Sequence, residues 1–211
     1  MSHVTQEKQH GLWFHLLDVV FNIVVIVAIV AGIRTFLVSP FQVEGSSMSS
    51  TLEDNEYIVI NKLSYYVGDP QRGDVVVFRP PNEPSKYYVK RVIGLPGDEV
   101  ILRDGWVYLK EAGSAQERRL EEEYLDNGNV GRTFRRVPGD DASESRFSVP
   151  SGHYFLLGDN RQGSVDSRSF VGSGDAQTPF VADEAIKGKV WFVALPVTKI
   201  HALEAPVYNE D

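Results

Sequence analysis

The sequence predicts a mainly β domain with coiled or barrel-like sheets, preceded by one transmembrane helix. Two features indicate this: a single long apolar segment near the N-terminus, and many short β-branched runs after it. The 211 residues suit one domain with appendages. The net charge of −8 argues against a nucleic-acid partner, which would require a basic face. Because the chain has no Cys, thiol catalysis, disulfides and Cys-based zinc sites are excluded, and we expect no metal or cofactor.

The apolar segment covers residues 12–38 and contains only two formally charged residues, Asp18 and Arg34. It exceeds the about 20 apolar residues that cross a bilayer, and it is apolar on all sides, which is rare for a buried helix of a soluble protein. No A-x-A motif follows it, which disfavours a cleaved secretory signal. We therefore predict a short N-terminal segment at 1–11, an uncleaved anchor at 12–38 and a β domain at 39–211. The charges at the anchor's ends leave its orientation open.

After the anchor, the pattern changes to short runs rich in Val, Ile, Tyr and Phe, bounded by Gly, Pro and Asp. Closely spaced runs of this kind are typical of an all-β domain. Asp104-Gly105 lies between two such runs and predicts a tight hairpin. The predicted strands are residues 56–62, 74–78, 87–93, 99–102, 106–109, 153–157 and 189–193.

Two segments depart from this pattern. Residues 110–148 are charged and poor in apolar side chains, so we predict a variable insertion with loops, partly helical around Gln116–Tyr124. Residues 171–179 are rich in glycine and predict a surface loop.

A serine nucleophile needs a neutral base within hydrogen-bond reach. Three of the five histidines lie in or before the anchor, and neither His153 nor His201 has an acidic neighbour that would indicate a triad. A lysine can replace histidine if burial lowers its pKa from about 10.4. Lys90 lies inside the apolar run 87–93, although alternation along a half-buried strand places it on the solvent face.

Four segments stand out for their residue types and order: 40–52, 72–78, 88–98 and 158–168. The first contains Val-Glu-Gly-Ser-Ser-Met, the third Tyr-Val-Lys-Arg-Val-Ile-Gly-Leu-Pro-Gly-Asp, and the fourth begins Gly-Asp-Asn-Arg. Together they resemble the type I signal peptidases, which are membrane-bound Ser–Lys proteases. The resemblance implies a catalytic β domain outside the cytoplasmic membrane with the N-terminus inside. It also implies cleavage of signal peptides from exported preproteins, after small residues at −1 and −3.

Carried over by position, the resemblance implies Ser47 rather than Ser46 as nucleophile and Lys90 as general base. Ser164 is implied as a hydroxyl that holds the lysine amine. The Ser47 N–H would supply one oxyanion donor, but Gly45 stands where some members carry a serine, so the second donor is open. The resemblance further implies Val43, Met48, Leu52, Tyr88 and Val89 as pocket residues, and Arg91, Asp159, Asp166 and Arg168 as ion-pairing structural residues.

The chain also departs from the family pattern. Ser50 stands where proline is common, Gln162-Gly163 replace Asp-Asn before Ser164, and residues 171–179 lengthen a connection. These departures leave open how Ser164 is supported and how that edge of the site is shaped.

The short tether gives an independent reason for the substrate class. Ser47 lies nine positions after Val38, so the nucleophile lies within roughly 30 Å of the anchor's end. Such a tether favours substrates whose scissile bond follows an apolar segment. Two alternatives are a self-cleaving Ser–Lys repressor, which would need a DNA-binding module, and a non-enzymatic membrane-tethered β domain. The preproteins that are cut and the oligomeric state are left open.

Overall fold

The computed structural model describes residues 11–135, 143–170, 178–206 and 208. Three of the predicted segments fall partly outside the described residues: the N-terminal segment at 1–10, the insertion at 136–142 and the loop at 171–177. The chain divides into two compact units, with the boundary between Val38 and Ser39.

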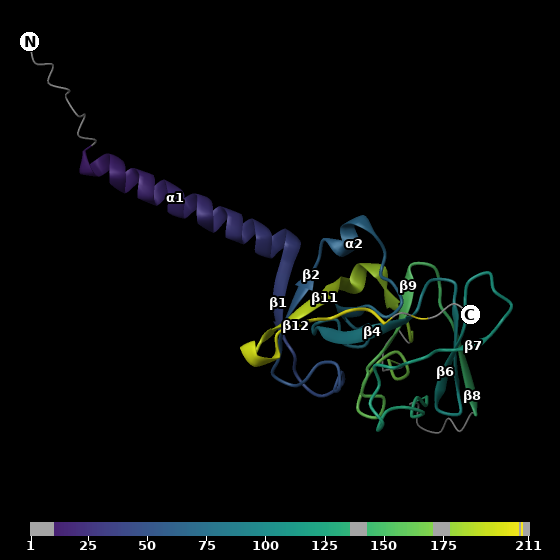
Figure 1. Cartoon of the computed structure of the whole chain (residues 1–211). Coiled ribbons are helices and arrows are strands. Elements are labelled where there is room, and N and C mark those ends of the chain that lie inside the picture. The colour runs from purple at the N-terminus through teal and green to yellow at the C-terminus, as the bar shows by residue number, and fades with distance from the viewer. Residues whose placement is uncertain (1–10, 136–142, 171–177, 207, 209–211) are drawn as a thin grey trace, which may run out of the picture. The chain divides into compact units, whose positions relative to one another are not determined.

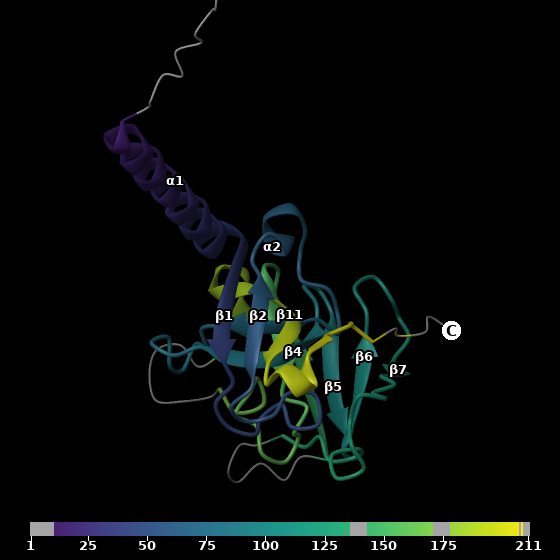
Figure 2. The same ribbon diagram turned by 60° about the vertical axis from the view of Figure 1, so that its left-hand side comes forward.

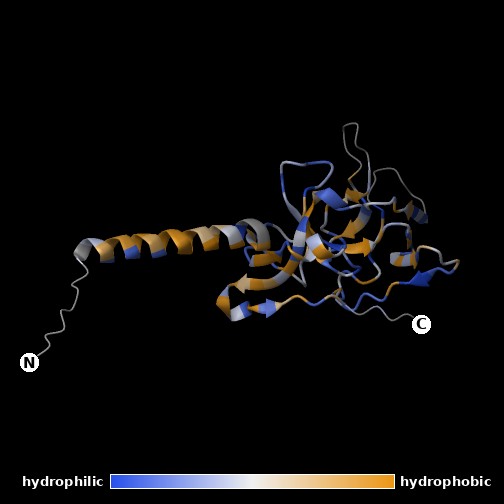
Figure 3. Ribbon diagram, turned by 90° about the horizontal axis from the view of Figure 1, so that it is seen from above, coloured by the Kyte–Doolittle hydropathy of each residue, from blue (hydrophilic) through white to orange (hydrophobic). Residues whose placement is uncertain are grey.

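The first unit is the apolar helix α1, Leu12–Gly32, which ends in a π-helical turn, Ile33–Leu37. Figure 3 shows the predominance of apolar residues along it. By length and composition, Trp13–Gly32 is a candidate membrane span, and none of its most apolar stretch is buried within the protein. The helix gives way to strand β1 at Val38, two residues before Pro40, because proline disfavours helical backbone in the residue before it.

The second unit contains a large sheet in which the neighbours run β1-β2-β11-β3-β4-β9-β10, with β12 also paired to β11 (Figures 1 and 2). β11 is long and has bulges against both β2 and β3, and bulges increase the twist and bend of a strand. As a result the sheet curls: the rings of Phe41 and Tyr87 lie 5.2 Å apart although three strands separate β1 from β4. The strands are β1 Val38–Gln42, β2 Tyr57–Asn61, β3 Val75–Phe78, β4 Tyr88–Gly94, β9 His153–Leu157, β10 Val181–Ala182, β11 Ile186–Leu195 and β12 His201–Ala202.

A second sheet has the order β7-β6-β5-β8, and its ladders are antiparallel. The predicted hairpin joins β5 to β6: Asp104 and Gly105 both have positive φ, as a two-residue hairpin turn of this type requires. The strands are β5 Glu99–Arg103, β6 Trp106–Lys110, β7 Arg118–Arg119 and β8 Glu144–Ser148. Short helical turns complete the fold: α2 Ser64–Val67, η2 Asp183–Ala185 and η3 Val197–Lys199.

The mainly β prediction is confirmed, but the prediction for residues 110–148 is wrong in two respects. No helix occurs at Gln116–Tyr124, where β7 is found, and strand β8 was missed at the end of the segment. The charged residues of β8 lie on the outer face of the sheet: Arg146, for example, pairs with Glu99 and Glu117. Phe147, on the opposite face of β8, packs into the core. The charged residues of β8 that suggested a loop therefore form the solvent-facing side of a strand.

Gly105 tests the importance of the hairpin. Gly105 has a φ of +82°, and a Cβ there would lie 2.1 Å from the Gly131 carbonyl oxygen. Gly113 has a similar φ of +80°, but a Cβ there would meet no atom within 4 Å. We expect Gly113→Ala to lower the free energy of unfolding by about 1 kcal/mol from backbone strain. We expect Gly105→Ala to lower it by about 1–3 kcal/mol more, because of the overlap. Urea unfolding of the detergent-solubilised chain, followed by Trp fluorescence, measures both, and equal losses would contradict this account.

Candidate active site

Ser47 lies in a compact turn between β1 and β2. Successive hydrogen bonds, including Leu52 N–H to the Met48 carbonyl at 2.8 Å, fold residues 46–52 into tight turns. Met48 and Leu52 are buried in the core beneath this turn, which fixes the backbone around the serine. Gly45 enters the turn with a φ of +87°, which favours glycine, and its N–H donates to Asp54 Oδ1 at 2.7 Å.

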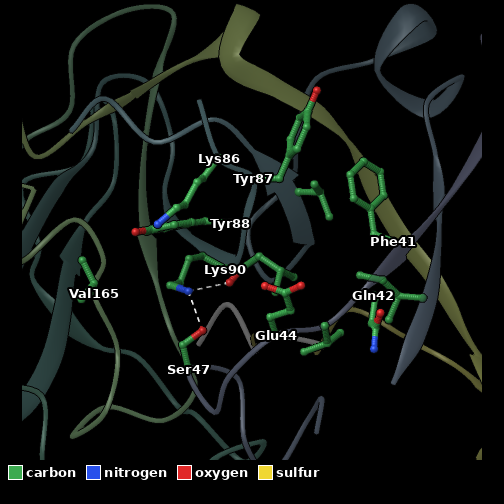
Figure 4. Close-up of a pocket in the computed structure, with 13 residues that line it drawn as sticks. Phe41, Gln42, Glu44, Ser47, Lys86, Tyr87, Tyr88, Lys90 and Val165 are labelled. Atoms are coloured by element: carbon green, nitrogen blue, oxygen red, sulfur yellow. Dashed lines mark hydrogen bonds between the residues drawn. The ribbon is translucent and has the colours of Figure 1, made fainter. Parts of the chain in front are cut away.

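Lys90 lies on β4 and is only 3% exposed. Its Nζ donates to Ser47 Oγ at 2.7 Å and to the Val89 carbonyl at 2.7 Å (Figure 4). The solvent-facing position that strand alternation favours is therefore wrong. The reason is that most of β4 is buried on both faces, so alternation carries no information there.

Burial lowers the pKa of Lys90 to about 8, because the ammonium loses its hydration. The carboxylates of Asp166 and Asp159 oppose this effect, and the Arg168 guanidinium adds to it. At pH 7 about a tenth of the lysine is then neutral. A neutral amine in contact with a hydroxyl is the arrangement that activates a serine nucleophile.

A buried ion pair connects β4 to the Ser47 turn. Arg91 Nε and Nη2 donate to the two carboxylate oxygens of Asp159 at 2.9 and 2.6 Å. Thr51 Oγ1 donates to Asp159 Oδ2 at 2.6 Å, and the Asn160 N–H donates to the Ser47 carbonyl at 3.1 Å. The pair therefore fixes the strand that carries the lysine against the turn that carries the serine.

A second buried pair lies on the segment after β9. Arg168 donates to Asp166 through Nε at 2.8 Å and Nη2 at 2.7 Å, and both side chains are completely buried. Burial by itself would raise the pKa of Asp166, but the Arg168 charge and its hydrogen bonds, with the Gly158 N–H, hold that pKa below its usual value. Asp159 and Asp166 thus each have a buried arginine partner, and both pairs hold backbone segments of the site in place.

Ser164 is buried, and its Oγ has no hydrogen-bond partner among the described residues. The expected hydrogen bond to Lys90 is therefore absent from this structure. Ser164 instead packs against Gly158, where a Cβ would lie 2.1 Å from Ser164 Oγ and 2.5 Å from the Ser47 carbonyl oxygen. Glycine is required there because three segments approach one another closely.

A pocket of about 570 Å³ opens beside Ser47 and Lys90 (Figure 4). Residues 41–44 and 86–90 form its two long sides, with Ile58 and Val77 from neighbouring strands. Of the five expected pocket residues, the structure places three in the lining and the other two, Met48 and Leu52, in the core beneath. The three in the lining are Val43, Tyr88 and Val89.

Sequence reasoning missed the residues that pack around Arg91 and Arg161 behind the site. Arg161 is completely buried and donates to Glu122 Oε1 and Thr133 Oγ1, both at 2.5 Å. The Tyr124 ring lies 3.9 Å from Arg91 Cζ, in a cation–π contact. Glu122, Tyr124 and Thr133 come from the segment predicted as a variable insertion. No local pattern marks them, because Glu122 and its partner Arg161 are 39 positions apart.

Comparison with known proteins identifies the family. The sequence profile described as "Signal peptidase, peptidase S26" matches residues 16–195. "Signal peptidase I" of Bacillus licheniformis is 36% identical over 197 residues, covering 93% of this chain and 98% of the relative. That of Pseudomonas fluorescens is 36% identical over 199 residues, covering 78% and 67%. The crystal structure of a signal peptidase I from Enterococcus faecalis is 30% identical, with a TM-score of 0.42, over 58% of this chain and 97% of that one. With a profile that spans most of its length, this chain belongs to the signal peptidase family, peptidase S26.

Proposed function

We propose that this chain is a serine endopeptidase that removes signal peptides from exported preproteins, with Ser47 as nucleophile and Lys90 as general base. The observation that carries the proposal is the 2.7 Å contact between Lys90 Nζ and Ser47 Oγ at a buried position. Family membership supports the reaction class. None of the described residues favours a self-cleaving repressor or a non-enzymatic binding domain.

The site supports a two-step reaction. Neutral Lys90 accepts the proton of Ser47 Oγ as the oxygen attacks the scissile carbonyl carbon, and the resulting ammonium donates a proton to the leaving amine. Lys90 then activates a water that hydrolyses the acyl-enzyme. The Ser47 N–H stabilises the oxyanion. Gly45 has no side chain to provide a second donor, and its own N–H already donates to Asp54.

The pocket suits an extended segment with small side chains near the scissile bond. Val43, Ile58, Val77 and Val89 provide apolar walls next to Ser47. Small residues at −1 and −3 of the signal peptide would fit against these walls, and larger side chains would overlap them.

The proposed placement of the enzyme combines α1, a candidate membrane span, with the orientation that the family resemblance implies. We assign this helix as the anchor of a membrane-bound protein, with the N-terminus on the cytoplasmic side and residues 39–211 on the outer side. A catalytic domain on the outer side meets preproteins where their signal peptides leave the bilayer.

Replacement of the nucleophile is the direct test. We expect Ser47→Ala to reduce cleavage of a preprotein in detergent by about 10⁴-fold or more, because the attacking oxygen is removed. Ser46→Ala, one residue away, is the matched control and should retain activity within a few-fold. Wild-type turnover by Ser47→Ala would exclude the mechanism.

The pH dependence of kcat/KM tests the base. Since the neutral amine is the active form and its pKa is about 8, kcat/KM should rise about tenfold per pH unit well below that value and level off above it. Lys90→Arg should abolish turnover at every pH, because arginine cannot release its proton. A flat profile from pH 6 to 9, or turnover by Lys90→Arg, would rule out Lys90 as the base.

Gly158 tests the close approach of the three segments. A methyl group at 158 would displace Ser164 and the Ser47 carbonyl, so we expect Gly158→Ala to lower kcat about 100-fold. Gly68→Ala is the control, because its Cβ would meet only one atom, at 3.8 Å. Equal kcat values for the two folded variants would show that the packing of Gly158 does not position the serine.

A further inference from the structure

The segment after β12 crosses the domain toward β6 and β7 (Figures 1 and 2). Leu203, at its start, packs against the core cluster that contains Met48 and Leu52. Tyr208 packs against a different cluster, formed largely by the second sheet. The segment therefore links two of the three core clusters formed by the described residues.

Gly73 allows this segment to approach closely. It has a φ of +91°, and a Cβ there would lie 2.8 Å from Pro206 Cδ and 3.1 Å from Tyr208 Cε2. The carbonyl of Gly73 accepts a hydrogen bond from Arg91 Nη1 at 2.9 Å. Tyr208 and Pro206 thus pack on the same backbone that holds the Arg91 guanidinium.

The surroundings of Tyr208 are charged, yet its hydroxyl is buried and has no hydrogen-bond partner among the described residues. Burial raises the pKa of Tyr208 to about 12; the Arg91 charge opposes the rise, while Glu122 and Asp159 add to it. The ring therefore contributes packing against Gly73, whose carbonyl accepts from Arg91, and the hydroxyl contributes no direct bond.

We infer that Tyr208 is a positioning residue for catalysis, which excludes water from the Arg91–Asp159 pair and so holds Ser47 against Lys90. Water at such a pair would screen its attraction and compete for its hydrogen bonds. The effect reaches the nucleophile through two short links: Thr51 donates to Asp159, and Asn160 donates to the Ser47 carbonyl. The inference rests on the proposed function, because positioning is measured here through cleavage.

The first experiment compares Tyr208→Phe with Tyr208→Ala in the full chain in detergent, with rates expressed per folded enzyme. Tyr208→Phe should keep wild-type kcat, since only an unpaired hydroxyl is lost. Tyr208→Ala should lower kcat about tenfold with KM unchanged, because the pocket walls at 41–44 and 86–90 do not include this residue. Tyr66→Ala, at a tyrosine that is 73% exposed, is the control and should match wild type. Wild-type kcat in Tyr208→Ala, or an equal change in kcat and KM, would overturn the inference.

A double-mutant cycle separates positioning from general destabilisation. If Tyr208 acts through the ion pair, Tyr208→Ala should have little further effect on kcat in an Asp159→Asn background. Fully additive losses would overturn the inference. Thr51→Val replaces Asp159→Asn if the latter does not fold, and Tyr208→Leu replaces Tyr208→Ala for the same reason. Failure of the wild-type chain to cleave any preprotein would instead refute the proposed function, so the two failures are distinguishable.

Discussion

The removal of Lys90 from water is the constraint on which the rest of the structure depends. Lowering the pKa of this lysine to about 8 costs about 3 kcal/mol at neutral pH relative to an exposed lysine. Because the unfolded chain binds this proton more tightly, the cost is complete below about pH 8 and disappears as pH rises toward the ordinary value. The curled sheet, the turn of Ser47 and the core beneath it together provide the dry environment that lowers this pKa.

Close to that lysine, the chain buries four charges as two arginine–carboxylate pairs, Arg91–Asp159 and Arg168–Asp166. Buried pairs of this kind contribute little net stability, but they hold backbone segments in a fixed geometry. Among the buried cations that the structure describes, Lys90 is the one with no carboxylate in direct contact. The two pairs thus hold the segments in place, and the pKa of Lys90 stays below its ordinary value.

The sequence predicted the local structure well and the long-range structure poorly. Alternating β-branched runs located most strands, and Asp104-Gly105 located the hairpin, because these signals are local. Alternation misplaced Lys90, since it cannot reveal that a curled sheet is buried on both faces. The charges of residues 110–148 concealed β8 and the supports Glu122 and Tyr124, whose partners are far away in the chain. The family resemblance pointed to Ser47 and Lys90. It did not predict that Ser164 would pack against Gly158 without a hydrogen bond to Lys90.

The span of the contacts around Ser47 has a consequence for biogenesis. Thr51 meets Asp159 across 108 positions, and the Ser46 carbonyl meets Asn160 across 114. Contacts so distant in sequence form late and slowly in folding. A nascent chain that already contains Ser47 therefore still lacks the Arg91–Asp159 pair and the buried surroundings of Lys90. We therefore expect the protease to be inactive while it is being synthesised, and to become active only after Asp159 and Asn160 have joined the turn that carries Ser47.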